Sequence, residues 1–183
     1  MELSNRNHDF QTQLKQLTFK TYRHNQVETF DYDSLFANQR VVVFSITRML
    51  IAESYNQFKA FDLDYSNILN YGIDNVYSVN PFEKMFGPWA EKHSDKITGL
   101  IDFEKQFTKE LAKIYYPDYE VNSLSRYWQY ILILNDGVPE KMWNNPYRPD
   151  LSLRILRNPG YQYRKIKPNI VLDYLKNSVD SST

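Results

Sequence analysis

The 183 residues carry 22 basic and 22 acidic side chains, so the formal net charge at pH 7 is zero. This balance argues against any general electrostatic attraction to nucleic acid or to an anionic membrane surface. The chain contains no cysteine, which excludes disulfides, thiolate metal sites and thiol catalysis by this chain acting alone.

The N-terminal sequence MELSNRNHDFQTQLKQ is polar and lacks the apolar core of a signal peptide. No apolar run approaches the roughly 20 residues that cross a membrane. We therefore expect a soluble, cytoplasmic protein that does not enter the membrane. The length is typical of one domain, so we predict a single domain over residues 1–183, with a polar N-terminal arm at residues 1–17.

The first predicted element is a β-hairpin. The segments LTFKTY and QVETFDY alternate apolar and polar residues on either side of His24 and Asn25, which is typical of two short strands joined by a turn. The segment DYDSLFANQ then predicts a short helical turn. The next run, RVVVFSI, is continuously apolar and rich in β-branched residues, so we expect a central strand that is buried on both faces.

After this strand, apolar residues recur mostly at steps of three and four, which predicts a helix that ends near Gly72. Its core-facing stripe would consist of Ile51, Tyr55, Phe58, Phe61, Tyr65, Ile68 and Leu69.

The next unit is again a strand followed by a helix. NVYSVN predicts the strand, and Asn80 and Pro81 supply a cap and a first-turn proline for the helix. This helix is expected to bury Phe82, Met85 and Phe86, and Gly87-Pro88 is expected to break or kink it.

A further strand, ITGLID, precedes another helix. Asp102 is placed to cap that helix, and Phe107, Leu111 and Ile114 recur at helical spacing along it. The alternation of strands and helices predicts an α/β protein.

The last third of the chain begins with a strongly apolar strand, YWQYILIL, and the NDG sequence at residues 135–137 predicts a hairpin turn into VPEKMWN. Residues 144–165 contain three prolines and several arginines with weak periodicity, which indicates an irregular excursion. Pro168 begins a closing helix, and residues 177–183 form a polar tail. The complete order predicts a thioredoxin-like α/β fold, with a mixed central sheet and helices on both faces.

Several segments, matched in order and spacing over about residues 26–175, resemble the peroxiredoxins and within them the type-5, atypical two-cysteine branch of the redoxin group. The segments are QVETFDYDSLFANQRVVVFSI, NYGIDNVYSVNPFEKMFGPWAEKH, LIDFEKQFTKEL, SRYWQYILILNDGV and KPNIVLDYL. The resemblance implies a thioredoxin-like fold and a homodimer.

The signature of that family is a proline, three residues, a threonine, two residues and the peroxidatic cysteine, set at a strand-to-helix turn. The matching window here is TRMLIAES. Thr47 stands at the position of the first proline, Ile51 at the threonine, Ala52 at the following proline and Ser54 at the cysteine. Every diagnostic residue is therefore replaced, and these positions are vestigial.

The replacements remove the chemistry that the resemblance implies. A peroxidatic thiolate attacks peroxide and becomes a sulfenic acid, because a helix N-terminus and a nearby arginine lower its pKa. The hydroxyl of Ser54 cannot follow this path, and Ile51 lacks a hydroxyl to position the peroxide. Because Ile51 and Ala52 are replaced together with Ser54, natural degeneration explains the window better than an engineered exchange of the nucleophile.

Arg126 falls at the active-site arginine of the family, counted back from the Asp136-Gly137 turn. Two interpretations remain open. In the first, Arg126 presents a positive charge to the Ser54 turn and binds a small anion with help from the helix N-terminus. Alternatively, it pairs with Glu53 or another acid and has a structural role.

Other chemistry has little support in the sequence. A hydrolase built on Ser54 and Glu53 needs a base, and the only histidines are His8, His24 and His93. His93 ends a predicted helix, where a cation is favourable in itself. No spacing of histidines and carboxylates indicates a metal site, no glycine motif indicates a phosphate-binding cofactor, and zero net charge argues against nucleic acid.

We therefore predict a peroxiredoxin-like pseudoenzyme with no catalytic residues, metal or cofactor, which acts in binding or assembly as a homodimer or with a protein partner. The alternative is an enzyme or small-anion binder with a repurposed pocket around Glu53, Ser54 and Arg126.

Overall fold

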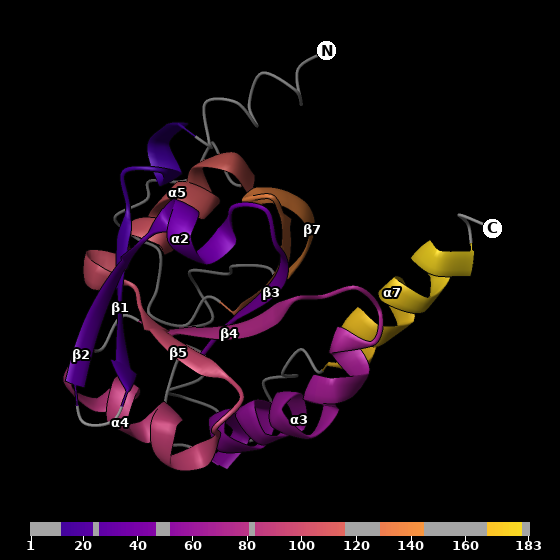
Figure 1. Ribbon diagram of the computed structural model, residues 1–183, viewed down its shortest axis with the longest axis horizontal. Coiled ribbons are helices and arrows are strands. Elements are labelled where there is room, and N and C mark those ends of the chain that lie inside the picture. The colour runs from indigo at the N-terminus through magenta and orange to yellow at the C-terminus, as the bar shows by residue number, and fades with distance from the viewer. Residues whose placement is uncertain are drawn as a thin grey trace, which may run out of the picture.

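The strands of the chain form one mixed sheet in the order β2-β1-β5-β4-β3-β6-β7 (Figure 1). The structure is a computed structural model, and it describes residues 12–23, 26–46, 52–80, 83–115, 129–144 and 168–180. The strands are β1 (Thr18–Arg23), β2 (Gln26–Asp31), β3 (Arg40–Ser45), β4 (Asn75–Asn80), β5 (Thr98–Ile101), β6 (Tyr130–Asn135) and β7 (Val138–Asn144).

The three inner strands β3, β4 and β5 are parallel to one another, while β1 and β6 are antiparallel to their neighbours. The helices lie on both faces of this sheet (Figure 1). They are α2 (Tyr32–Phe36), α3 (Ala52–Leu69), α4 (Glu83–His93), α5 (Gln106–Tyr115) and α7 (Asn169–Asp180). The predicted mixed sheet with helices on both faces is confirmed.

One face of the sheet is covered by α2 and α5. Phe19 of β1 is buried on this face, with its ring centroid 5.6 Å from that of Phe36 and 5.4 Å from that of Phe107. Leu14 and Leu17 are buried in the same cluster. The predicted polar arm therefore contributes apolar side chains to the core just before β1.

The opposite face is covered by α3, α4 and α7. Phe61 of α3 stacks on Phe44 of β3 with ring centroids 4.1 Å apart, and Phe58 and Ile68 are buried beside them. The predicted stripe is confirmed for these residues, whereas Tyr55 is 39% exposed. Tyr55 lies to one side of the buried residues, because it is turned by about 60° from Phe58, about 120° from Phe61 and about 140° from Ile68.

Helix α4 differs from its prediction in two respects. Phe86 is buried as expected, but Met85 is 52% exposed, because it is turned by about 100° from Phe86. The helix also continues through Pro88, so the predicted break is wrong. Burial of Phe86 and Ala90 on either side of the proline holds the helix on the sheet and offsets the missing backbone bond.

The connections follow the turn signals in the sequence. The predicted NDG hairpin is confirmed, and Asp136 and Gly137 have φ values of 51° and 70°, as a type I′ turn requires. Strands β1 and β2 form the predicted first hairpin, and residues 24–25 lie outside the described part.

The closing helix α7 is confirmed, and it runs to Asp180, past the point where the polar tail was expected to begin. The excursion predicted at 144–165 lies outside the described residues except for Asn144, which ends β7. Among the described helices, none combines the length and the apolar character that crossing a membrane requires.

Candidate functional site

Strands β3, β4 and β5 are parallel, so their carboxyl ends lie together at one end of the sheet, which we call the Ser54 end. Ligands of open α/β sheets bind beyond the carboxyl ends of the strands. Helix α3 begins at Ala52, shortly after β3 ends, and its third residue, Ser54, has a fully buried side chain. Ser54 thus lies in the first turn of α3.

A hydrogen-bond chain ties the three strand ends together. The backbone N–H of Ile46 donates to the carbonyl oxygen of Val79 at 2.9 Å, and the side-chain amide of Asn80 donates to the carbonyl oxygen of Ile46. The backbone N–H of Asp102 in turn donates to the carbonyl oxygen of Asn80 at 3.0 Å. Asn80 is completely buried, so these bonds fix the start of the segment that leads to Ser54.

Ser45 fixes the start of β6 at the same end of the sheet. Its Oγ accepts a hydrogen bond from the backbone N–H of Tyr130 at 2.9 Å and donates to the carbonyl oxygen of Tyr130 at 3.5 Å. The preceding residue, Gln129, is also buried. The chain that leads back to Arg126 therefore starts from a point held on β3.

Asp102 is a buried carboxyl that follows β5 directly. It accepts hydrogen bonds from the backbone N–H of Phe107 at 2.9 Å, and from the backbone N–H and hydroxyl of Thr108 at 3.0 and 2.6 Å. Burial raises the pKa of Asp102 above its ordinary value, although these bonds act in the opposite direction. Asp102 therefore caps α5, as predicted, and acts across the intervening turn Phe103–Lys105.

The predicted site residues are described only in part. Ala52 is exposed at the start of α3, and Ser54, two residues later, is buried. Thr47, Ile51 and Arg126 lie outside the described residues. Glu53 belongs to α3, and its side chain is likewise outside the described part. The neighbourhood of Arg126 therefore stays a prediction.

His93 ends α4 as expected, and a lysine of α3 contacts the same helix end. The Nζ of Lys59 donates to the carbonyl oxygen of His93 at 2.7 Å. Burial lowers the pKa of His93, and the positive charges of Lys92 and Lys59 lower it further. The ring lies edge-on between Tyr55 and Trp89, and both centroid distances are 5.0 Å.

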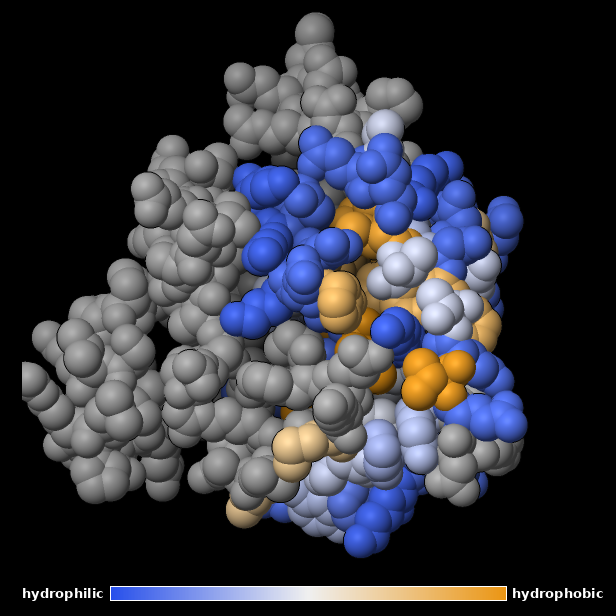
Figure 2. Space-filling view, turned by 90° about the vertical axis from the view of Figure 1, so that its left-hand side faces the viewer, coloured by the Kyte–Doolittle hydropathy of each residue, from blue (hydrophilic) through white to orange (hydrophobic). Residues whose placement is uncertain are grey.

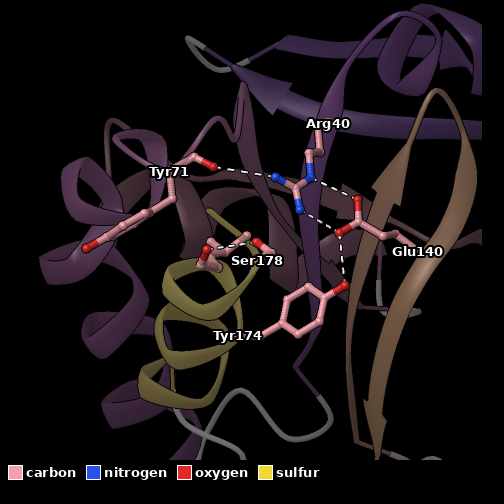
Figure 3. A network of polar contacts seen from close by, with 6 residues as sticks. Arg40, Tyr71, Glu140, Tyr174 and Ser178 are labelled. Carbon is pink, nitrogen blue, oxygen red and sulfur yellow. Dashed lines mark hydrogen bonds and ion pairs between the residues drawn. The ribbon is translucent and has the colours of Figure 1, made fainter. Parts of the chain in front are cut away.

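A second polar network lies at the amino end of β3 (Figure 3). Arg40 donates through Nε and one terminal nitrogen to the two carboxylate oxygens of Glu140, at 2.8 and 2.5 Å. The hydroxyl of Tyr174 donates to Glu140 at 3.2 Å. These hydrogen bonds raise the pKa of Arg40. The network joins α7 to β3 and β7 at the end of the sheet opposite Ser54.

Ser45 had no predicted role, and Asn80 was predicted only as a helix cap, whereas its side-chain amide bonds to the backbone of Ile46. A signal was present, because a polar residue closes each apolar strand: Ser45 ends RVVVFS, Asn80 ends NVYSVN and Asp102 follows TGLI. Only the pairing of the strands shows that these polar residues meet.

No family model matches the chain. By sequence, it is similar to the hybrid peroxiredoxin hyPrx5 of Haemophilus influenzae, with 24% identity over 137 residues, which cover 73% of this chain and 56% of the relative. It is also similar to peroxiredoxin sll1621 of Synechocystis sp., with 27% identity over 120 residues, which cover 62% of this chain and 61% of the relative. The matched part thus spans less than two thirds of each relative.

The fold is similar to that of the antioxidant protein of Plasmodium falciparum, a 1-Cys peroxiredoxin. The TM-score is 0.68 at 14% sequence identity, and the match covers 88% of this chain and 96% of that chain. The predicted thioredoxin-like fold is thereby confirmed, and the predicted resemblance agrees with both sequence relatives.

Proposed function

We propose that this chain, a homologue of the peroxiredoxins that contains no cysteine, acts in binding or assembly and has no thiol peroxidase activity. The observation that carries the proposal is Ser54, which stands in the first turn of α3 with no exposed surface. A peroxidatic group must be a thiolate and must meet the peroxide directly. Ser54 supplies neither the sulfur nor the access.

The buried polar side chains at the carboxyl ends of β3, β4 and β5 support a structural role for this part of the chain. Ser45, Asn80 and Asp102 are buried and hydrogen-bond to the backbone of the chain itself. Such bonds hold the strands and α5 in place and stabilise the fold. The described polar side chains at the carboxyl ends of β3, β4 and β5 therefore serve the fold.

The proposal includes a homodimer, which the family resemblance implies, or a protein partner. It also includes a cytoplasmic location. Sedimentation of the purified protein and fractionation of its source cells test these two parts separately.

The direct test measures hydrogen peroxide consumption by the purified chain with dithiothreitol or a thioredoxin system as reductant. We expect no turnover above the reductant alone. Turnover that scales with protein concentration would sink the proposal, and a Ser54→Ala variant would then show whether Ser54 takes part.

A Ser54→Cys variant asks whether the surroundings still activate a thiol. Burial raises the pKa of a thiol, and Ile51 offers no hydroxyl to the peroxide. We therefore expect this thiol to react with peroxide within about tenfold of the rate of free cysteine, a difference of about 1.4 kcal/mol in activation free energy. Mass spectrometry after trapping of the sulfenic acid measures the rate. A fast reaction would show that only the nucleophile has been lost.

The alternative proposal is a small-anion site formed by Glu53, Ser54 and Arg126, and the start of α3 at Ala52 supports it, because helix N-termini attract anions. Native mass spectra of protein purified gently from its source cells, beside an Arg126→Met variant, separate the two proposals. A small mass that is lost in the variant favours the anion site. Spectra that show only oligomers or a protein partner, unchanged by the variant, favour the binding role.

A further inference from the structure

We propose that the exposed edge of β2 binds an extended, basic segment of a partner protein, which adds to the sheet as a further strand. This inference rests on the proposed binding role and names a surface and a partner chemistry for it. Strand β2 lies four strands from β3 in the sheet order, so this surface is separate from the Ser54 end of the sheet.

Strand β2 ends the sheet and is exposed on both faces. Five of its six residues are exposed and Phe30 is half-buried, and the side chain of Val27 is 55% exposed. Figure 2 shows the side of the molecule on which β2 lies in Figure 1, and apolar residues there lie among polar ones. An exposed strand of this kind is a template for pairing with another strand.

The hydrogen-bonding pattern shows which backbone groups are available. The N–H of Tyr32 donates to the carbonyl oxygen of Leu17 at 3.1 Å, directly beyond the ladder that pairs Thr18 with Asp31. Because bonded and non-bonded pairs alternate in an antiparallel ladder, the backbone N–H and C=O groups of Val27 and Thr29 point away from β1. An added strand would bond to these two residues.

The charges at this edge favour a basic occupant. Glu28, Asp31 and Asp33 are all exposed. Asp33 lies 3.8 Å from the Nζ of Lys15, and Asp31 accepts hydrogen bonds from Ser34, so Glu28 is the carboxylate within β2 that is best placed to meet a basic side chain. Hydrogen bonds from Ser34 lower the pKa of Asp31. A second copy of β2 that paired antiparallel about Glu28 would place the two Glu28 carboxylates opposite each other, which is destabilising. A segment with lysine or arginine beside a β-branched residue complements the carboxylates and packs on Val27.

The test uses a capped eight-residue peptide of alternating lysine and valine, titrated into the isotopically labelled full chain. We expect chemical-shift changes in β2 and slower hydrogen exchange at the amides of Val27 and Thr29. A glutamate–valine peptide, and a lysine–valine peptide with alternate N-methylated amides, are the controls and should bind about tenfold more weakly or worse. Equal binding of either control, or no binding of the lysine–valine peptide at millimolar concentration, overturns the proposal.

A pair of variants locates the site. Thr29→Pro removes an outward N–H without removing a bond to β1, and proline is tolerated at such edge positions. We expect Thr29→Pro to weaken peptide binding about tenfold and Thr29→Ala to leave it unchanged. If Thr29→Pro does not fold, the N-methylated peptide gives the same answer. Pairing of β2 with a second copy, detected as a dimer that excludes the peptide, also overturns the proposal. Peroxide turnover plays no part in this test, so its failure leaves the loss of peroxidase activity standing.

Discussion

At the residue scale, Asp102 shows how one buried carboxyl serves the fold. It ends a strand and accepts hydrogen bonds from Phe107 and Thr108, so it satisfies backbone donors at the start of α5 that the helix itself cannot. The hydroxyl of Thr108 also lies 3.4 Å from that of Tyr130. Burial raises the pKa of Tyr130, and the nearby charge of Asp102 adds to this effect. The cluster joins β5, α5 and β6.

We expect Asp102→Asn to lower the free energy of unfolding by about 1–3 kcal/mol at pH 7, because an amide cannot accept on both sides. The folded pKa of Asp102 is raised, so the native state binds more protons than the unfolded state, and this group adds stability as the pH falls through the folded pKa. Asparagine does not titrate. The difference between wild type and variant should therefore grow between pH 7 and about pH 4.5 in urea unfolding. A difference that shrinks over this range would contradict the assignment.

At the element scale, α7 is held by the network of Arg40, Glu140 and Tyr174. Val171 and Leu175 bury the inner face of the helix, and Trp143 packs edge-on against Tyr174 with centroids 5.5 Å apart. The side chains of Arg40 and Glu140 keep 23% and 22% of their surface exposed. The ion pair is therefore neither fully screened by water nor fully buried, and its two parallel hydrogen bonds give it a defined geometry.

We expect Glu140→Gln to lower stability by about 1 kcal/mol and to speed hydrogen exchange in α7 more than in α5. The reason is that Arg40 loses its carboxylate and Tyr174 its charged acceptor. Glu110→Gln, which breaks the more exposed pair with Lys113 in α5, is the matched control and should change little. Equal effects of the two variants on α7 would show that the network does not hold the helix.

At the scale of the whole molecule, the two core clusters lie on opposite faces of the same strands. Val43 faces α2 and α5, while its neighbours Val42 and Phe44 face α3, α4 and α7. Loss of β3 or β6 would expose both clusters at once, because strands shared by two cores cannot leave one intact.

We therefore expect one cooperative transition in urea, with coincident curves from far-ultraviolet circular dichroism and tryptophan fluorescence. Trp89 and Trp143 pack against the α3, α4 and α7 cluster, so their fluorescence reports that face, whereas circular dichroism reports the entire backbone. Two separated transitions would contradict the prediction of a single domain.

The sequence by itself determined the order and type of the elements. Continuous apolar runs gave buried strands such as RVVVFS, helical spacing gave the stripe of Phe58, Phe61 and Ile68, and NDG gave a type I′ hairpin. These signals are local, since periodicity and turn chemistry depend on residues close in sequence. The absence of cysteine, and with it of thiol chemistry, is likewise a property of the sequence alone.

The tertiary structure decided which side chains meet and which are exposed. It buries Ser54. It also brings together residues 34 to 100 positions apart, through the hydrogen bonds of Asn80 and Ser45 and the ion pair of Arg40 with Glu140. Tyr55 and Met85 are exposed because each lies to the side of the helix face that packs on the sheet. Helix α4 passes through Pro88 because the packing of Phe86 and Ala90 overrides local propensity. Such outcomes depend on strand order and helix orientation, which the chain acquires only when distant segments pack together.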